Sequence, residues 1–218
     1  MLAAALGSLG ATCSTVGPTE PGVGPAPLSE SRPTALAVSA IAAIGQGAGM
    51  QGLNRTTQSS VAVGGALARR LSISDGFSLD MSASAAAYRS TLEGGPVPVG
   101  GVGGRLWLGP DGPLPLGVEL AVVERMNRVL EARFSPTLEV RLLAAYRFPG
   151  RGCLWIAARP GLYGWALTID PRFASLELPI GAAFDLGALR IGGELGVDWF
   201  PAGGVWGARA NASAAATF

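Results

Sequence analysis

Residues 138–148 read LEVRLLAAYRF, and an apolar residue stands at every second position of this stretch. The apolar series runs from Leu138 to Phe148, and the charged residues Glu139, Arg141 and Arg147 all occupy intervening positions. A helix would spread these charges around its circumference, whereas a strand places them on one side. The stretch therefore predicts a β-strand with one apolar face and one polar face.

The same period of two recurs along most of the chain. Residues 77–87, 176–186 and 189–199 alternate in this way, and turns rich in Gly, Pro and Asp separate the alternating stretches, for example at 74–76 and 110–113. The stretches have the length that a tilted membrane strand needs. The predicted strands cover residues 34–45, 56–69, 77–90, 98–108, 115–125, 136–148, 153–169, 174–186, 188–200 and 205–218.

Two segments leave the number of strands open at eight, ten or twelve. Residues 119–134 also fit an amphipathic helix, because Val122, Met126 and Phe134 have helical spacing. In 153–169 the alternation changes phase across Pro160 and Gly161, which predicts a β-bulge there.

The composition favours a membrane protein that lacks spanning helices. A mean hydropathy of +0.37 with 14% charged residues is more apolar than a typical soluble domain. The best candidate for a helical span, residues 33–54, is broken by the Gly-rich sequence at 45–49. The fold expected is therefore all-β: an antiparallel up-and-down transmembrane β-barrel of ten strands.

The last predicted strand adds a resemblance to a known class. Its apolar face runs from Trp206 through a series of alanines to Phe218, where the chain ends. This strand resembles the C-terminal strand of bacterial outer-membrane β-barrel proteins. The resemblance implies that Phe218 is the signal read by the outer-membrane assembly machinery, that the barrel contacts membrane lipid, and that the protein lies in the outer membrane of a Gram-negative bacterium.

The N-terminal residues differ from the rest of the chain. Residues 1–13 form an apolar leader like that of a secretory signal, and Cys13 lies in a loose lipoprotein-like motif, which makes it the candidate for lipidation. Residues 14–33 form a linker rich in Pro, Gly and Ser, and the barrel domain is expected over 34–218.

The polar faces carry charges of both signs, which we expect to point into the barrel because they would be costly in hydrocarbon. At this strand number the lumen is narrow and filled by side chains. The expected function is a structural or adhesive role, or a narrow channel for a small solute or ion. The candidate lumen charge network consists of Asp80, Arg105, Glu119, Glu139, Arg141, Arg147, Glu177, Asp185, Arg190, Glu194, Asp198 and Arg209.

Several function classes are disfavoured by what the sequence lacks. With no His, the imidazole-based catalytic arrangements are missing, so we expect no enzyme and no cofactor. Cys13 and Cys153 lack metal-ligand spacing, and we expect neither a metal site nor a disulfide. A net charge of +1 argues against a nucleic-acid partner.

Alternation alone does not say which face points inward. The alternative is a soluble or lipid-tethered barrel with its apolar face inside, binding an apolar ligand. The scarcity of charge and the terminal Phe218 argue against it.

Overall fold

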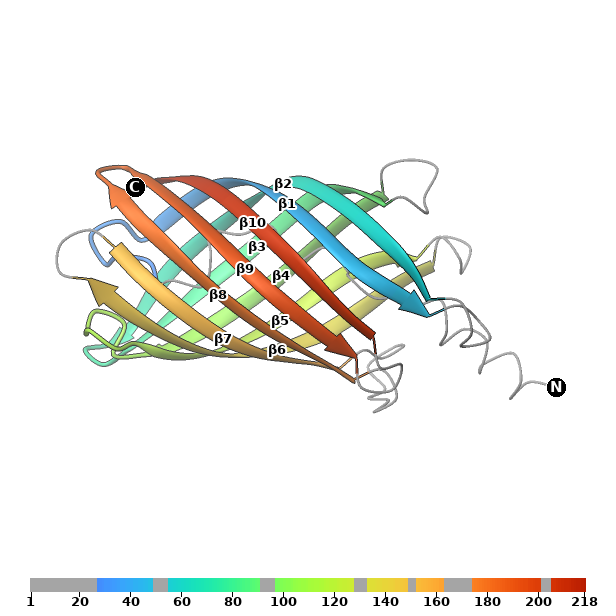
Figure 1. Ribbon diagram of the computed structural model, residues 1–218. Coiled ribbons are helices and arrows are strands. Elements are labelled where there is room, and N and C mark those ends of the chain that lie inside the picture. The colour runs from blue at the N-terminus through green and yellow to red at the C-terminus, as the bar shows by residue number, and fades with distance from the viewer. Residues whose placement is uncertain are drawn as a thin grey trace.

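The computed structural model describes residues 27–48, 55–90, 97–127, 133–148, 152–162, 174–200 and 205–218. In this part of the chain ten antiparallel strands close into one barrel (Figure 1). The strands are β1 (Thr34–Ala48), β2 (Arg55–Ser74), β3 (Phe77–Ser90), β4 (Val97–Leu108), β5 (Leu116–Asn127), β6 (Arg133–Phe148), β7 (Gly152–Leu162), β8 (Ala174–Leu186), β9 (Leu189–Phe200) and β10 (Val205–Thr217).

Each strand pairs with the next along the chain, and β10 closes the barrel against β1. At this seam the backbones of Thr34 and Phe218 exchange two N–H to C=O hydrogen bonds of 3.0 Å. The predicted up-and-down barrel of ten strands is confirmed. Because the number is even, β1 begins and β10 finishes at the same end of the barrel, which we call the terminal end (Figure 1). The opposite end is called the distal end.

The helical interpretation of residues 119–134 is wrong for the residues that the structure describes. Residues 119–127 continue strand β5, which pairs with β4 and β6 on either side, and residues 128–132 lie outside the described part. Val118, Leu120 and Val122 take successive outward positions and are exposed. Pairing with two neighbouring strands satisfies the backbone, and this outweighs a local spacing that also fits a helix.

The bulge predicted at Pro160 and Gly161 is absent. β7 keeps one register with β6 and with β8 on both sides of these two residues, through to Leu162. The later part of the predicted strand, residues 163–169, lies outside the described residues. Among the described residues, a register irregularity occurs instead in β2, between Ser72 and Ser74, beyond the predicted end of that strand at 69.

The run considered as a helical span is a strand over nearly all of its described part, and its residues 49–54 lie outside that part. Its residues 34–48 form β1. In the part of the chain that is described, no helix is long and apolar enough to cross a membrane.

The two faces of the wall differ sharply in composition. Large apolar side chains point outward: Leu142 on β6 is 55% exposed, whereas Leu143 beside it points inward and is 4% exposed. The buried inward positions carry mostly Ala, Ser and charged residues. The wall is thus apolar outside and polar inside, so the alternative of a barrel with an inward apolar face is not favoured.

The described end of the predicted linker lies inside the barrel. Pro27 and Leu28 are buried at the terminal end, before the chain turns at residues 29–32 and enters β1. Leu28 packs in a pocket of small inward side chains from three adjacent strands. If these small side chains were replaced by larger ones, Leu28 would have no room in the pocket. These are Ala35 and Ala37 of β1, Ala66 and Ala68 of β2, and Ala215 of β10.

Candidate functional site

A row of alternating charges crosses five neighbouring strands of the lumen wall. Arg70 of β2 pairs in register with Asp80 of β3, Asp80 with Arg105 of β4, Arg105 with Glu119 of β5, and Glu119 with Arg141 of β6. Every residue in the row therefore has opposite charges beside it, which is the favourable cross-strand arrangement. Strand pairing alone produces this order from residues far apart in sequence.

Glu119 is the fourth of the five residues in this row and is fully buried. Its Oε1 lies 3.0 Å from Nε of Arg105, and its Oε2 accepts a 2.9 Å hydrogen bond from Nη1 of Arg141. A buried carboxylate is tolerated only when its charge is compensated in this way, and removal of one partner is strongly destabilising. The three side chains therefore fix how β4, β5 and β6 face the lumen.

A second charged group lies on β7 to β10. Nη1 of Arg209 is 2.7 Å from Oε1 of Glu177, and its Nη2 donates a 3.1 Å hydrogen bond to Oε1 of Glu194. The other oxygen of Glu194 accepts a 3.3 Å hydrogen bond from the indole N–H of Trp155. This group places paired charges on the lumen side of β8, β9 and β10.

Glycines make room for the two buried tryptophans. A Cβ added at Gly117 would lie 2.7 Å from Cε3 of Trp107, so the ring packs closely against the backbone of the neighbouring strand. Trp155 covers Gly181 of β8 in the same manner. Each ring therefore fits within a narrow lumen only because its cross-strand neighbour has no side chain.

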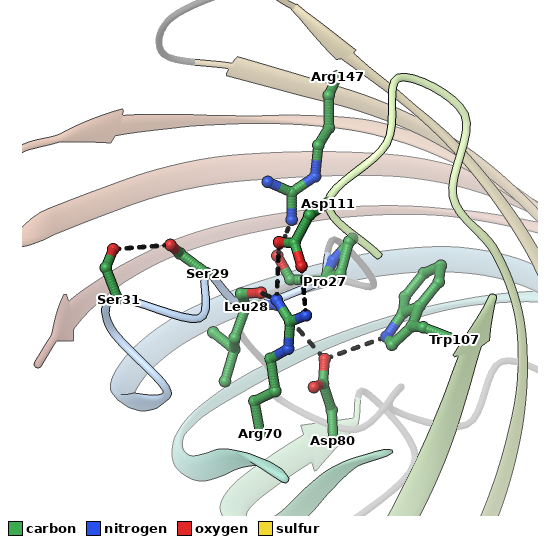
Figure 2. Close-up of polar contacts among 9 residues, drawn as sticks. All are labelled: Pro27, Leu28, Ser29, Ser31, Arg70, Asp80, Trp107, Asp111 and Arg147. Atoms are coloured by element: carbon green, nitrogen blue, oxygen red, sulfur yellow. Dashed lines mark hydrogen bonds and ion pairs between the residues drawn. The ribbon is translucent and has the colours of Figure 1, made fainter. Parts of the chain in front are cut away.

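The terminal end holds a third charged group, built around Pro27 and Leu28, which we call the plug segment (Figure 2). Arg70 makes two hydrogen bonds to the carboxylate of Asp111, of 2.9 and 2.6 Å, and a 2.7 Å hydrogen bond to the carbonyl of Leu28. The Leu28 N–H donates to Oδ2 of Asp80 at 3.4 Å, and the indole N–H of Trp107 donates to the same oxygen at 3.0 Å. Both backbone polar groups of Leu28, its N–H and its carbonyl, are thus hydrogen-bonded to side chains of the lumen wall.

Asp111 belongs to the turn between β4 and β5, outside the strands. The hydrogen bond from Arg70 lowers the pKa of Asp111 below its ordinary value, and the partial burial of the carboxyl opposes this only in part. The ionised form therefore persists to lower pH than in a free aspartate.

Two further arginines bind the carbonyl of Pro27. Nη2 of Arg147 on β6 donates to it at 3.3 Å, and Nη1 of Arg190 on β9 at 3.5 Å. Arg190 also makes two hydrogen bonds, of 2.6 and 3.0 Å, to Asp185 on β8. Arginines from three strands therefore converge on two consecutive carbonyls.

The structure brings most of the predicted lumen charges into these three groups. Each of the five described lumen carboxylates of the predicted set contacts an arginine or a tryptophan: Asp80, Glu119, Glu177, Asp185 and Glu194. Glu139 and Asp198 lie on β6 and β9, but their side chains fall outside the described residues.

Sequence reasoning missed five participants: Pro27, Leu28, Arg70, Asp111 and Trp155. Arg70 was missed because the predicted strand stopped one residue before it, although its alternation with Ala66 and Ala68 was a usable signal. Asp111 was interpreted only as a turn residue.

The two other predicted sites stand apart from the lumen charges. Phe218 projects outward with 65% of its surface exposed. Cys13 lies outside the described residues, and Cys153 is a buried free thiol. Among the described residues, no group of three or more His, Cys, Asp or Glu side chains could hold a metal ion.

Comparison with known proteins supports the fold. No protein-family model and no curated protein matches the sequence. Among solved structures, an outer membrane channel from Pseudomonas putida F1 has a TM-score of 0.56 at 12% identity, over 94% of this chain and 100% of that one. At this identity the similarity shows the fold alone. The resemblance to outer-membrane β-barrels is therefore confirmed at the level of the fold.

Two other channel structures are less similar. The KdgM porin has a TM-score of 0.45 at 8% identity, over 84% of this chain and 99% of that one. The toluene transporter TbuX of Ralstonia pickettii has a TM-score of 0.34 at 10% identity, over 87% and 90%.

Proposed function

We propose that this protein is a narrow outer-membrane channel for small polar solutes, held closed in this conformation by its own residues Pro27 and Leu28. The observation that carries the proposal is the sorting of the wall, with apolar side chains outside and paired charges inside. Only a surrounding of lipid makes such an outer surface stable, and a lumen of this composition is polar enough for hydrated solutes.

The shape of the barrel indicates its orientation. The connections at the terminal end cover residues 75–76, 109–115, 149–151 and 187–188, and those at the distal end cover 49–54, 91–96, 128–132, 163–173 and 201–204, so the distal connections are longer on average. Outer-membrane barrels have short periplasmic turns and longer extracellular loops. The terminal end, with Pro27 and Leu28, therefore faces the periplasm in this proposal.

The comparisons and the packing support a channel that is closed. The Pseudomonas putida protein that shares the fold is an outer membrane channel. Here, Leu28 fills an alanine pocket and Pro27 is held from two sides by arginines, so the segment occupies the lumen at one end. Movement of this segment would be the step that opens the terminal end.

Conductance in planar lipid bilayers tests the proposal. We expect the wild-type protein to open rarely and Leu28→Ser to open more often, because the substitution removes the packing that seats the segment. Leu114→Ser is the matched control, since Leu114 lies in a turn between β4 and β5 and is 66% exposed. If Leu28→Ser folds but conducts no more than the control, the segment does not close a channel.

The second candidate is a structural barrel without a channel. It is favoured by the pairing of the lumen charges, which links neighbouring strands. Absence of conductance in both the wild type and Leu28→Ser would support it. An adhesive role stays a prediction, because the distal connections that would carry it lie outside the described residues.

A further inference from the structure

The three arginines at the terminal end make an unusual set of contacts. Arg70, Arg147 and Arg190 come from β2, β6 and β9 and donate to the carbonyls of Leu28 and Pro27. Figure 2 shows Arg70 and Arg147 reaching toward this backbone from opposite sides. The lumen thus directs three guanidinium groups at a short piece of uncharged chain.

Two of these arginines have a carboxylate of their own, and the third does not. Arg70 is paired with Asp111 and Arg190 with Asp185. Within the described part of the chain, Arg147 has the Pro27 carbonyl as its hydrogen-bond partner and forms no ion pair with a carboxylate, and its Nε is buried without a hydrogen bond. A peptide carbonyl carries only a partial charge, so Arg147 is incompletely compensated.

An anionic oxygen would satisfy this site better than the carbonyl does. Hydrogen bonds from a guanidinium to a carboxylate or phosphate are shorter and about twice as strong as those to neutral acceptors. The ion pairs with Asp111 and Asp185 already hold Arg70 and Arg190 in place, so little ordering remains to be done on binding. Arg147 and Arg190 both reach the Pro27 oxygen, and an oxyanion at that position would contact both.

We infer that Arg147 and Arg190 form a binding site for a small oxyanion, a carboxylate or phosphate group, which the carbonyl of Pro27 occupies in this conformation. The ligand and the plug segment, Pro27 and Leu28, then compete for the same guanidinium groups. The inference rests on the proposed function, since it gives the class of solute that a channel opening at this end would accept.

The test is a binding titration of the full-length protein in detergent. Sodium phosphate and sodium acetate are titrated by calorimetry, with sodium chloride at equal ionic strength as reference. We expect saturable binding of at least one of the two oxyanions. Which of them binds assigns the ligand to the phosphate or the carboxylate class.

Three variants separate this site from unspecific attraction. Arg147→Gln should weaken binding about tenfold or more, because one of the two guanidinium groups of the site is lost. Arg69→Gln is the matched control, because Arg69 precedes Arg70 but is exposed outside the barrel, and its binding should equal that of the wild type. Leu28→Ser should bind several-fold more tightly, since the competing segment is held less firmly.

The outcomes distinguish this inference from the proposed function. Equal binding by the wild type, Arg147→Gln and Leu28→Ser, or no saturable binding of either oxyanion, would overturn the inference even if the protein conducts. Binding with the expected order of affinities, but without conductance, would support the site and contradict the channel. If Arg147→Gln does not fold, the comparison of Leu28→Ser with the wild type still tests the inference: tighter binding by Leu28→Ser supports it, and equal binding overturns it.

Discussion

At the scale of single residues, charge pairing determines what the lumen looks like. Glu119 is buried between Arg105 and Arg141, and Arg209 bridges Glu177 and Glu194. Such contacts are weak sources of net stability, but each side chain is needed once its partners are buried. Their main consequence is that the strands have a defined register and a defined inner face.

The contact of Asp111 with Arg70 leads to a prediction about acid stability. Because the pKa of Asp111 is lowered in the folded protein, its ionised form adds stability above the pKa of an unfolded aspartate, about 3.9. This contribution is lost as the pH falls through the lower pKa of the folded state. Thermal unfolding in detergent, followed by circular dichroism, should show a wild-type melting temperature that falls below about pH 4 more than that of Asp111→Asn.

The effect should be small, since the Asp111 side chain is 53% exposed and solvent screens the pair. The same dependence on pH in both proteins would show that this ion pair contributes nothing.

The position of a residue could be predicted where the alternation within its strand determines it, and could not be predicted where contacts with other strands determine it. Arg105, Glu119 and Arg141 lie on polar faces that alternation identifies, so their inward position could be expected. Which charges contact one another depends on the register between strands, and the alternating pattern within one strand does not determine that register. The docking of Pro27 and Leu28 depends on a pocket that exists only after β1, β2 and β10 have paired.

At the scale of the strand, the alternation of faces is a testable property. Ala83 and Ser84 are neighbours near the middle of β3, one exposed outward and the other partly buried toward the lumen. An arginine on the lipid face near the midplane costs about 2–4 kcal/mol, whereas lumen positions tolerate polar groups. We expect Ala83→Arg to reduce folding into lipid vesicles strongly and Ser84→Arg to reduce it little, as measured by the folded fraction on unboiled gels.

These two variants differ by one position in sequence and share the same depth, so each is the other's control. Equal loss of folding in both would mean that the two faces of β3 are not those of a membrane strand.

Strands were the best predicted elements, because the apolar face of a membrane strand has a period that local sequence shows directly. The errors arose where local patterns conflict with pairing. Residues 119–127 have a helical spacing but lie between two partner strands, and Pro160 with Gly161 suggested a bulge in a strand whose register stays constant.

At the scale of the whole molecule, the closure of the barrel places Phe218 at its seam. The Phe218 backbone bonds to Thr34 while its ring projects outward. We propose that this ring is the signal read during assembly. Phe218→Ser should lower the amount of folded protein in outer membranes of expressing cells, yet fold as well as the wild type into vesicles of purified lipid. A loss of folding in the purified system as well would assign Phe218 a role in stability instead.

The claim that this chain forms a closed transmembrane barrel is tested most directly by folding the denatured protein into lipid vesicles and comparing its gel mobility with and without boiling. We expect folding that requires lipid or detergent, a β-type circular-dichroism spectrum, and a band whose mobility changes on boiling. A protein that stays soluble without detergent and migrates identically before and after boiling would contradict it.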